Sequence, residues 1–227
     1  MLPQQRAAVS VVFFFLWLSP TSANECGCSL VTTFMALISG EYSNAGDLGR
    51  ERPPPAQDEV NLILYEVDIP AFKPDRVLYF EERLNSNVLR QEVIVVGVSD
   101  EGFIQTLSHN FTLPAGSGNF STSLLSDLPL SAFSSRPECV SIYRPMEYNI
   151  FIGTYPDCTG HFDGFMYQQV ASYAVMLSCN SIATVTSFNL FPEASSHIPY
   201  SMWKISSLPL LSYGSCGESI LDDICTC

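Results

Sequence analysis

The side chains with the clearest chemical potential lie in one stretch, Val77–Val98, with the sequence VLYFEERLNSNVLRQEVIVVGV. Arg90 is the strongest candidate for a ligand contact, because a planar guanidinium can hold a carboxylate through two parallel hydrogen bonds. Glu81 could neutralise Arg90 or accept hydrogen bonds from the N–H groups of a ligand. Tyr79 and Gln91 are weaker candidates. The structural alternative is a surface ion pair of Arg90 with Glu81 or Glu92, which would stabilise the protein little.

Two strand-like segments must position these side chains. Val77–Glu82 and Val88–Val96 are rich in β-branched and aromatic residues, and the polar link Leu84–Asn87 predicts an antiparallel hairpin. Because side chains alternate across a strand, odd-numbered and even-numbered residues lie on opposite faces. Neither face is wholly apolar, so one face carries charge either into a barrel that holds a ligand or toward solvent. A shift of one residue in register would decide whether Glu81 and Arg90 meet.

The N-terminus predicts a cleaved secretory signal. Arg6 precedes the apolar run Ala7–Leu18, and Thr21–Ala23 supplies the small residues that a signal peptidase needs. The run is shorter than the roughly 20 residues that cross a bilayer. We therefore expect cleavage after Ala23 and a secreted, extracellular protein without a membrane anchor. The expected organisation is a signal peptide at 1–23, one β domain at 24–205 and a cysteine-containing tail at 206–227.

The composition excludes several functions. The formal net charge of −13 argues against nucleic acid and against anionic membranes as partners. His161 and Asp163 have the residue types of metal ligands, but two such residues do not make a site, so we predict no metal and no required cofactor. The sequence contains no phosphate-binding loop, no zinc-protease helix motif and no dinucleotide fingerprint. No catalytic residue is therefore assigned from motifs.

Cysteines and glycosylation sequons agree with export. An even number of cysteines in a secreted chain favours disulfides over thiolate metal ligands. Asn110 and Asn119 each begin a sequon, which places both asparagines at the surface. The eight cysteines are Cys26, Cys28, Cys139, Cys158, Cys179, Cys216, Cys225 and Cys227.

The mature chain has the pattern of an all-β domain with one short helix. Ser29 is a plausible N-cap, and apolar residues recur at helical spacing from Leu30 to Ile38. A long polar loop follows over 43–58, and another irregular connection covers 114–137. Many short strands at hairpin spacing predict an antiparallel meander, and closure into a barrel would remove its exposed edges. The expected strands span 60–69, 76–83, 88–98, 102–113, 139–144, 148–154, 164–177, 182–191 and 199–205.

The order of these motifs resembles the CpeT/CpcT family of phycobilin lyases, the T-type lyases. The resemblance covers about 30–205, and any one motif is weak, whereas the ordered set is moderately specific. It is carried by Ser39–Asn44, Leu78–Glu81, Leu89–Val93, Glu138-Cys139, Phe151–Gly153, Cys158, Gly164, Tyr167 and Met202-Trp203.

This resemblance implies a calycin-type, lipocalin-like antiparallel β-barrel. It also implies a bilin, an open-chain tetrapyrrole, as ligand, and a cysteine of a phycobiliprotein subunit as acceptor. Arg90 would then hold a propionate, and Trp203 could stack on the flat ligand, although a tryptophan at the end of a barrel is more often a core residue. Two alternatives remain: a secreted carrier of a small apolar carboxylate without enzymatic activity, and a barrel filled with side chains.

The chain departs from the family pattern at three places. It has Glu81-Glu82 where the family has Glu-Gln, and Leu89–Glu92 where the family tends to have Tyr-Arg-Gln-Arg. Thr184–Ser187 replaces a Trp-Asp-Arg-Gly stretch, which removes one acid and one base. Whether lyase activity survives these changes is therefore left open.

The cysteine pairing follows from the expected hairpins and from the family pattern. Cys139 and Cys158 both belong to that pattern and lie near the open ends of one predicted hairpin. We predict a disulfide between them, which closes a short loop worth roughly 3 kcal/mol. At least one further disulfide should join the N-terminal pair of cysteines to the tail, because barrel closure brings the first and last strands together.

Overall fold

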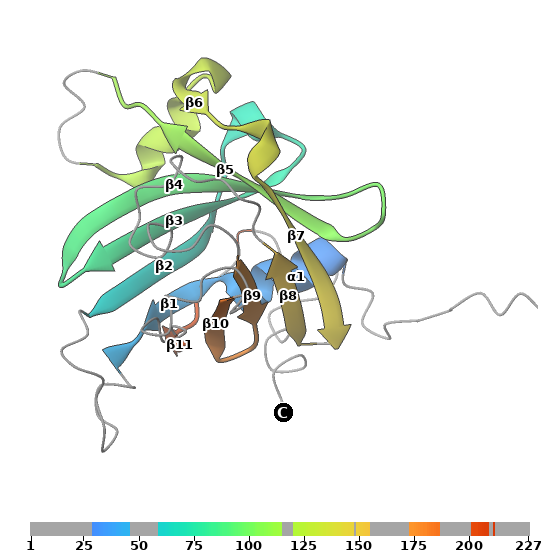
Figure 1. Ribbon diagram of the computed structural model, residues 1–227. Coiled ribbons are helices and arrows are strands. Elements are labelled where there is room, and N and C mark those ends of the chain that lie inside the picture. The colour runs from blue at the N-terminus through green and yellow to red at the C-terminus, as the bar shows by residue number, and fades with distance from the viewer. Residues whose placement is uncertain are drawn as a thin grey trace, which may run out of the picture.

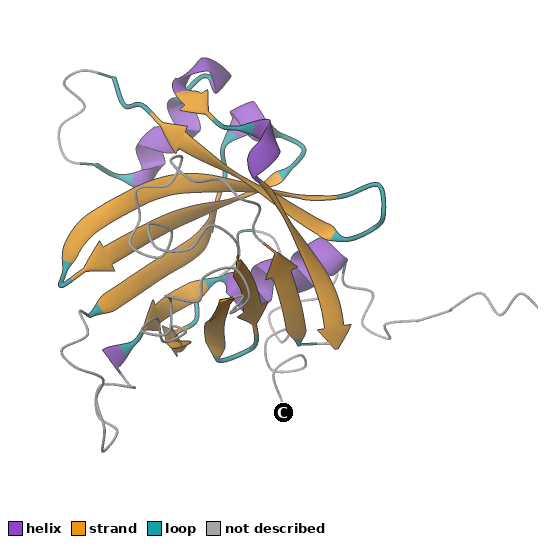
Figure 2. Cartoon of the chain, in the orientation of Figure 1, coloured by secondary structure: helices purple, strands orange, loops and turns teal. Residues whose placement is uncertain are grey.

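The computed structural model describes residues 29–45, 59–114, 120–147, 149–154, 173–186, 201–208 and 211, as a mostly β protein (Figures 1 and 2). The strands are β1 (Gly40–Ser43), β2 (Val60–Val67), β3 (Arg76–Leu84), β4 (Asn87–Val98), β5 (Ile104–Phe111), β6 (Phe133–Ser134), β7 (Val140–Glu147), β8 (Ile150–Thr154), β9 (Tyr173–Leu177), β10 (Ser181–Thr186) and β11 (Ser201–Ser206). The helical elements are α1 (Leu30–Ile38) and the short 3₁₀ turns η1 (Pro70–Phe72), η2 (Thr122–Asp127), η3 (Leu130–Ala132) and η4 (Pro137–Cys139).

Ten of these strands form a closed antiparallel barrel. Their order is β4-β3-β2-β1-β11-β10-β9-β8-β7-β5, and pairing of β4 with β5 closes the ring. The first and last strands, β1 and β11, lie side by side, as barrel closure requires. The predicted all-β barrel with one short N-terminal helix is therefore confirmed.

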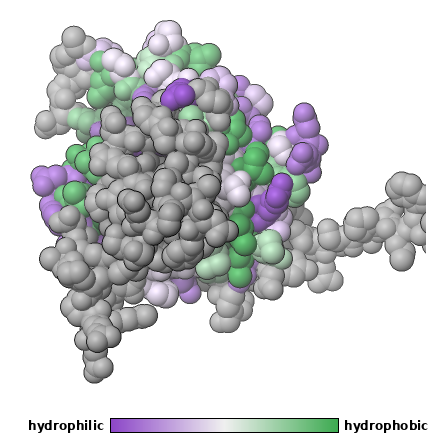
Figure 3. All heavy atoms as spheres, in the orientation of Figure 1, coloured by the Kyte–Doolittle hydropathy of each residue, from purple (hydrophilic) through white to green (hydrophobic). Residues whose placement is uncertain are grey.

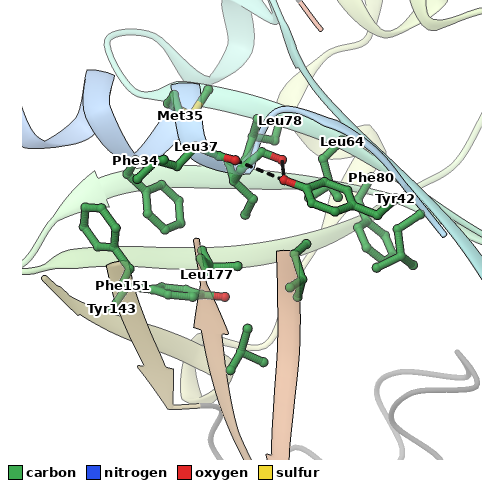
Figure 4. Close-up of a cluster of buried hydrophobic side chains, with 14 of the residues drawn as sticks. Phe34, Met35, Leu37, Tyr42, Leu64, Leu78, Phe80, Tyr143, Phe151 and Leu177 are labelled. Atoms are coloured by element: carbon green, nitrogen blue, oxygen red, sulfur yellow. Dashed lines mark hydrogen bonds between the residues drawn. The ribbon is translucent and has the colours of Figure 1, made fainter. Parts of the chain in front are cut away.

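Helix α1 packs into the barrel interior and fills part of it. Ser29 caps its N-terminus by accepting a hydrogen bond from the Thr32 N–H at 3.1 Å. Figure 4 shows Phe34 of α1 between the rings of Tyr143 and Phe151, with centroid distances of 4.9 and 5.3 Å. The Tyr42 hydroxyl donates to two carbonyl groups in the last turn of the helix. These contacts join α1 to opposite sides of the barrel wall in one apolar core.

A second apolar layer covers the outside of β3, β4 and β5. The connection that carries η2 and η3 packs there through Leu125, Leu128 and Phe133. Phe120 stacks on two rings of the strands, Tyr79 and Phe111, each with a centroid distance of 5.6 Å. Both faces of β3 are consequently buried, which explains why neither face of the hairpin has a purely polar sequence pattern.

The structure corrects three local predictions. Strand β1 was missed because Gly40–Ser43 is short and lacks a β-branched run, and it forms only between β2 and β11. The connection over 114–137, expected to be irregular, contains η2, η3 and β6. Strand β7 continues to Glu147, so the turn before β8 lies later than expected. The parts of the expected strands at 164–172, 187–191 and 199–200 lie outside the described residues.

The β3–β4 hairpin turns where the sequence predicts it. Asn85 and Ser86 have φ values of 49° and 67°, the left-handed conformation that a two-residue hairpin turn requires. The Asn85 side chain also accepts a hydrogen bond from the Glu59 N–H at 3.1 Å. Serine tolerates positive φ poorly, whereas glycine has no Cβ to clash.

Ser86→Gly is therefore expected to raise the free energy of unfolding by roughly 0.5 kcal/mol, because strain is relieved at a turn that already has the conformation glycine favours. Urea denaturation followed by circular dichroism measures the change. Asn85→Gly serves as the comparison, since it relieves the same strain but removes the side-chain bond to Glu59. A loss of stability in Ser86→Gly would contradict the turn geometry.

Candidate functional site

Register across the β3–β4 hairpin separates the candidate residues onto two faces. Arg90 lies opposite Glu82, and Glu92 lies opposite Phe80. Directly opposed residues of an antiparallel pair point to the same side of the sheet. Since Phe80 belongs to the core inside the barrel, Glu82, Arg90 and Glu92 also face the interior.

We call Glu82, Arg90, Glu92 and Ser108 the interior cluster. The first three are almost inaccessible to solvent, with exposed fractions of 0, 8 and 1%. Arg90 Nε donates to Glu92 Oε2 at 3.1 Å, and its Nη2 contacts the same oxygen. Ser108 of β5 donates to Glu92 Oε1 at 3.1 Å. The guanidinium also lies over the ring of Phe80, 5.2 Å from the centroid.

The interior cluster is therefore a buried ionic site and not a surface ion pair. Sequence reasoning selected Arg90 as a ligand contact and named Glu92 only as a possible surface partner of Arg90, whereas the structure buries that pair. The signal for the other members was available in the alternation of the strands, since Glu82 and Glu92 share the face of Phe80 and Arg90. Alternation along the strands does not tell which face of the hairpin lies inside the barrel.

We call Tyr79, Glu81, Arg83 and Gln91 the outer cluster, because these side chains lie on the outside of the barrel, where Tyr79 belongs to the second apolar layer. Glu81 accepts hydrogen bonds from the Tyr79 hydroxyl at 2.6 Å and from Gln91 Nε2 at 2.8 Å. Arg83 Nε contacts the other carboxylate oxygen at 2.6 Å. Tyr79, Glu81 and Gln91 thus do not join Arg90 in one site, and the pairing of Glu81 with Arg90 that was considered from the sequence is wrong.

Burial by itself would raise the pKa of Glu81, but the hydrogen bonds from Tyr79, Gln91 and Arg83 outweigh it, and the pKa of Glu81 is lowered. Burial also raises the pKa of the Tyr79 hydroxyl, and the neighbouring Glu81 adds to that increase. Because the folded state lowers the pKa of Glu81, this group stabilises the fold above the unfolded value near 4.5. That stability is lost as the pH falls through the folded pKa.

The difference in unfolding free energy between the wild type and Glu81→Gln is therefore expected to shrink as the pH falls below about 4.5. Urea titrations of both proteins at several pH values between 7 and 3 measure this difference, and the comparison cancels the contributions of the other carboxylates. If the difference in unfolding free energy between the two proteins stays constant over this pH range, the outer cluster does not stabilise the ionised form of Glu81.

The remaining predicted site residues lie apart from both clusters. Trp203 is 39% exposed on the outer side of β11, so it neither stacks inside the barrel nor belongs to the core. Asn110 is exposed in β5, whereas Asn119 lies outside the described residues. The signal peptide at 1–23, His161 and Asp163 also fall outside the described part of the chain.

Cys139 and Cys179 are both disulfide-bonded. They lie at opposite ends of the β7–β8–β9 sheet, because Cys139 precedes β7 and Cys179 follows β9. Cys158 and the other five cysteines lie outside the described residues, so the pairing of Cys139 with Cys158 stays a prediction.

Within the described ranges, no group of three or more His, Cys, Asp and Glu side chains is placed to hold a metal ion. No helix of the described chain has the length and apolarity to cross a membrane. Hydrophobic and hydrophilic side chains are interspersed on the coloured part of the face in Figure 3.

No family model and no curated protein matches the chain. A solved structure described as "SeMet CRL Protein of Arabidopsis" aligns with a TM-score of 0.46 and 10% sequence identity, over 72% of this chain and 91% of that chain. What the structure defines is a class: a closed ten-stranded antiparallel β-barrel with a buried ionic cluster in its interior.

Proposed function

We propose that the protein binds an elongated, largely apolar small molecule inside its barrel, and that this molecule is a bilin. The observation that carries the proposal is the interior cluster. Buried ion pairs stabilise proteins no better than well-packed apolar residues of similar size, and often less well. Glu82, Arg90 and Glu92 would therefore add little stability to a barrel whose interior was only a packed core. A few polar groups among apolar side chains are, however, typical of ligand-binding sites.

The resemblance to the T-type lyases supports the choice of a bilin. Two of the departures from that family's pattern, Glu82 and Glu92, are the two carboxylates of the interior cluster. If the attachment chemistry is retained, the protein transfers the bilin to a cysteine of an acceptor protein. If it is lost, the protein is a carrier that releases the bilin unchanged.

Binding is tested by titrating biliverdin or phycocyanobilin into the purified protein and recording the absorption spectrum. A saturable change with about one ligand per chain supports the proposal, and a spectrum identical to that of the free bilin overturns it. Ser108→Leu, which places a bulky side chain beside the interior cluster, is expected to weaken binding at least about tenfold, or about 1.4 kcal/mol. Gln105→Leu on the outer side of the same strand is the matched control and should bind normally.

Transfer is tested by adding an acceptor subunit with a free cysteine to the bilin-loaded protein. A coloured acceptor band that survives denaturation indicates lyase activity. Colour that stays with this protein and is extracted by solvent indicates a carrier. Replacement of the acceptor cysteine by serine controls for non-specific adducts.

Secretion and glycosylation belong to the same proposal, supported by the N-terminal sequence and by the exposed Asn110. The secreted protein is expected to lose mass on treatment with an N-glycosidase, and Asn110→Gln combined with Asn119→Gln should abolish that shift. A protein retained in the cell, or one whose mass does not change, would count against secretion.

A further inference from the structure

Lys204 of β11 is a partly buried lysine that faces the interior of the barrel. It lies opposite Tyr42 of β1, and Tyr42 belongs to the apolar core inside the barrel. Directly opposed residues of an antiparallel pair point to the same side of the sheet. The side chain runs close to the Gly40 backbone, since a Cβ added to Gly40 would lie 3.0 Å from Lys204 Cε and 3.2 Å from Cδ. The missing side chain at Gly40 therefore leaves the space through which Lys204 reaches the end of α1.

Lys204 differs from the other basic side chains in its partners. A carboxylate forms an ion pair with each of four others, Lys73, Arg76, Arg83 and Arg90. Lys204 has no carboxylate partner among the described residues. Its Nζ donates to the carbonyl oxygens of Leu37 at 2.7 Å and Ser39 at 3.0 Å, and it lies 5.3 Å from the centroid of the Tyr42 ring. Burial without a counter-ion favours the neutral amine, and it lowers the pKa of Lys204 to about 8.

The hydrogen bonds of Lys204 suit a neutral amine as well as an ammonium group. An ammonium group has three N–H donors, whereas a neutral amine has two donors and one lone pair. The carbonyl groups of Leu37 and Ser39 accept two donors. Loss of one proton therefore leaves both bonds to the end of α1 in place, with the lone pair directed away from the two carbonyl oxygens. The same side chain can cap the helix and act as a nucleophile.

We infer that Lys204 is a covalent binding site for an aldehyde on an apolar chain, which it holds inside the barrel as an imine. Lysine amines form Schiff bases with carbonyl compounds, and desolvation activates them for this reaction. The side chains around Lys204 include Tyr42 and Leu37 of the apolar core, so they favour an apolar chain on the aldehyde. This site is separate from the interior cluster, and the inference goes beyond the binding of a bilin.

The reaction needs no oxidant, reductant or metal. The lone pair of the neutral Lys204 amine adds to the aldehyde carbon. The two amine hydrogens then leave with the aldehyde oxygen as one molecule of water, and a carbon–nitrogen double bond remains. When the imine takes up a proton from water, its one N–H can donate again to the Leu37 or the Ser39 carbonyl.

The test uses the fact that Lys73 and Lys204 are the only lysines in the chain. The full protein is treated with hexanal at pH 8 in the presence of cyanoborohydride, which reduces imines to stable amines. Peptide mapping by mass spectrometry then gives the initial rate at each lysine and separates both from the N-terminal amine. An ordinary lysine is less than about 1% neutral at pH 8, against about half for Lys204. We expect labelling of Lys204 to be at least about fivefold faster, although the Lys73 side chain is 60% exposed.

The length of the aldehyde tests the apolar surroundings. With acetaldehyde in place of hexanal, the rate at Lys204 should fall at least about threefold more than the rate at Lys73, because the short chain buries less apolar surface. The same ratio of the two aldehydes at both lysines would overturn the inference, since it would show a reactive amine without a binding site. Labelling of Lys73 as fast as that of Lys204 would overturn it as well.

Two matched variants assign the product. Lys204→Arg keeps donors for the two carbonyl groups but cannot form an imine, so it should lose the fast phase of labelling. Lys73→Arg should keep that phase unchanged. A fast phase that persists in Lys204→Arg would contradict the inference. Where Lys204→Arg does not fold, the rates at the two lysines of the wild-type protein still decide the question. Bilin binding is measured separately, so failure of this site leaves the proposed function standing.

Discussion

Arg90→Met is expected to lower the free energy of unfolding by about 3–5 kcal/mol, since it leaves the buried carboxylate of Glu92 without its ionic partner. The substitution keeps most of the side-chain volume, so the loss reports charge more than packing. Arg83→Met is the matched control, because Arg83 also contacts a single glutamate but its side chain is 43% exposed. Glu81 keeps the hydrogen bonds from Tyr79 and Gln91 when Arg83 is replaced, and Arg83 itself is partly solvated, so the loss there is expected to stay below about 1 kcal/mol.

A double variant identifies the cause of the loss. If Arg90 is needed mainly to neutralise Glu92, Arg90→Met combined with Glu92→Met should recover much of the stability, because no new unpaired charge remains at that position. Urea unfolding curves of the two single variants and the double variant give the coupling energy. A loss no larger than that of Arg83→Met would show that the interior cluster is hydrated and not buried.

Gly153→Ala is expected to destabilise the protein by about 2–3 kcal/mol, which is the cost of forcing an extra carbon into a packed core. A Cβ at position 153 would lie 2.5 Å from Tyr143 Cδ1 and would also overlap Cε1 of the same ring. Tyr143 has no room to retreat, because its ring packs on Phe34 with a centroid distance of 4.9 Å. Thermal unfolding followed by circular dichroism measures the loss.

Gly97→Ala provides the control within another strand of the same barrel. A Cβ at that position would meet nothing closer than Gln105 Nε2 at 3.7 Å, which is ordinary van der Waals contact. In a Tyr143→Leu background, Gly153→Ala should cost clearly less than in the wild type, because the overlapping ring atoms are gone. Equal costs in both backgrounds would contradict the packing of Tyr143 on Gly153.

The sequence by itself determined the class of fold and most of the strands. β2, β3, β4 and β5 begin and end within about three residues of the predicted bounds, because β-branched and aromatic runs and turn residues are local signals. Helix α1 follows from its N-cap at Ser29 and its apolar spacing in the same way. The short strand β1 was not predictable, since Gly40–Ser43 becomes a strand only through its two neighbours in the closed barrel.

The composition of the candidate site was decided by the tertiary structure. Alternation along the strands predicts that Tyr79 and Glu81 share one face of β3, and this is what the structure shows. It does not say which face closes around the interior or which residues lie opposite one another, because both depend on contacts between strands far apart in the chain. Register placed Arg90 opposite Glu82, with Glu92 as its ionic partner, and it placed Glu81 on the outside, buried against Tyr79 and Gln91. The same two strands therefore carry two polar clusters on opposite faces, and their position relative to the barrel wall distinguishes the proposed ligand site from the outer cluster.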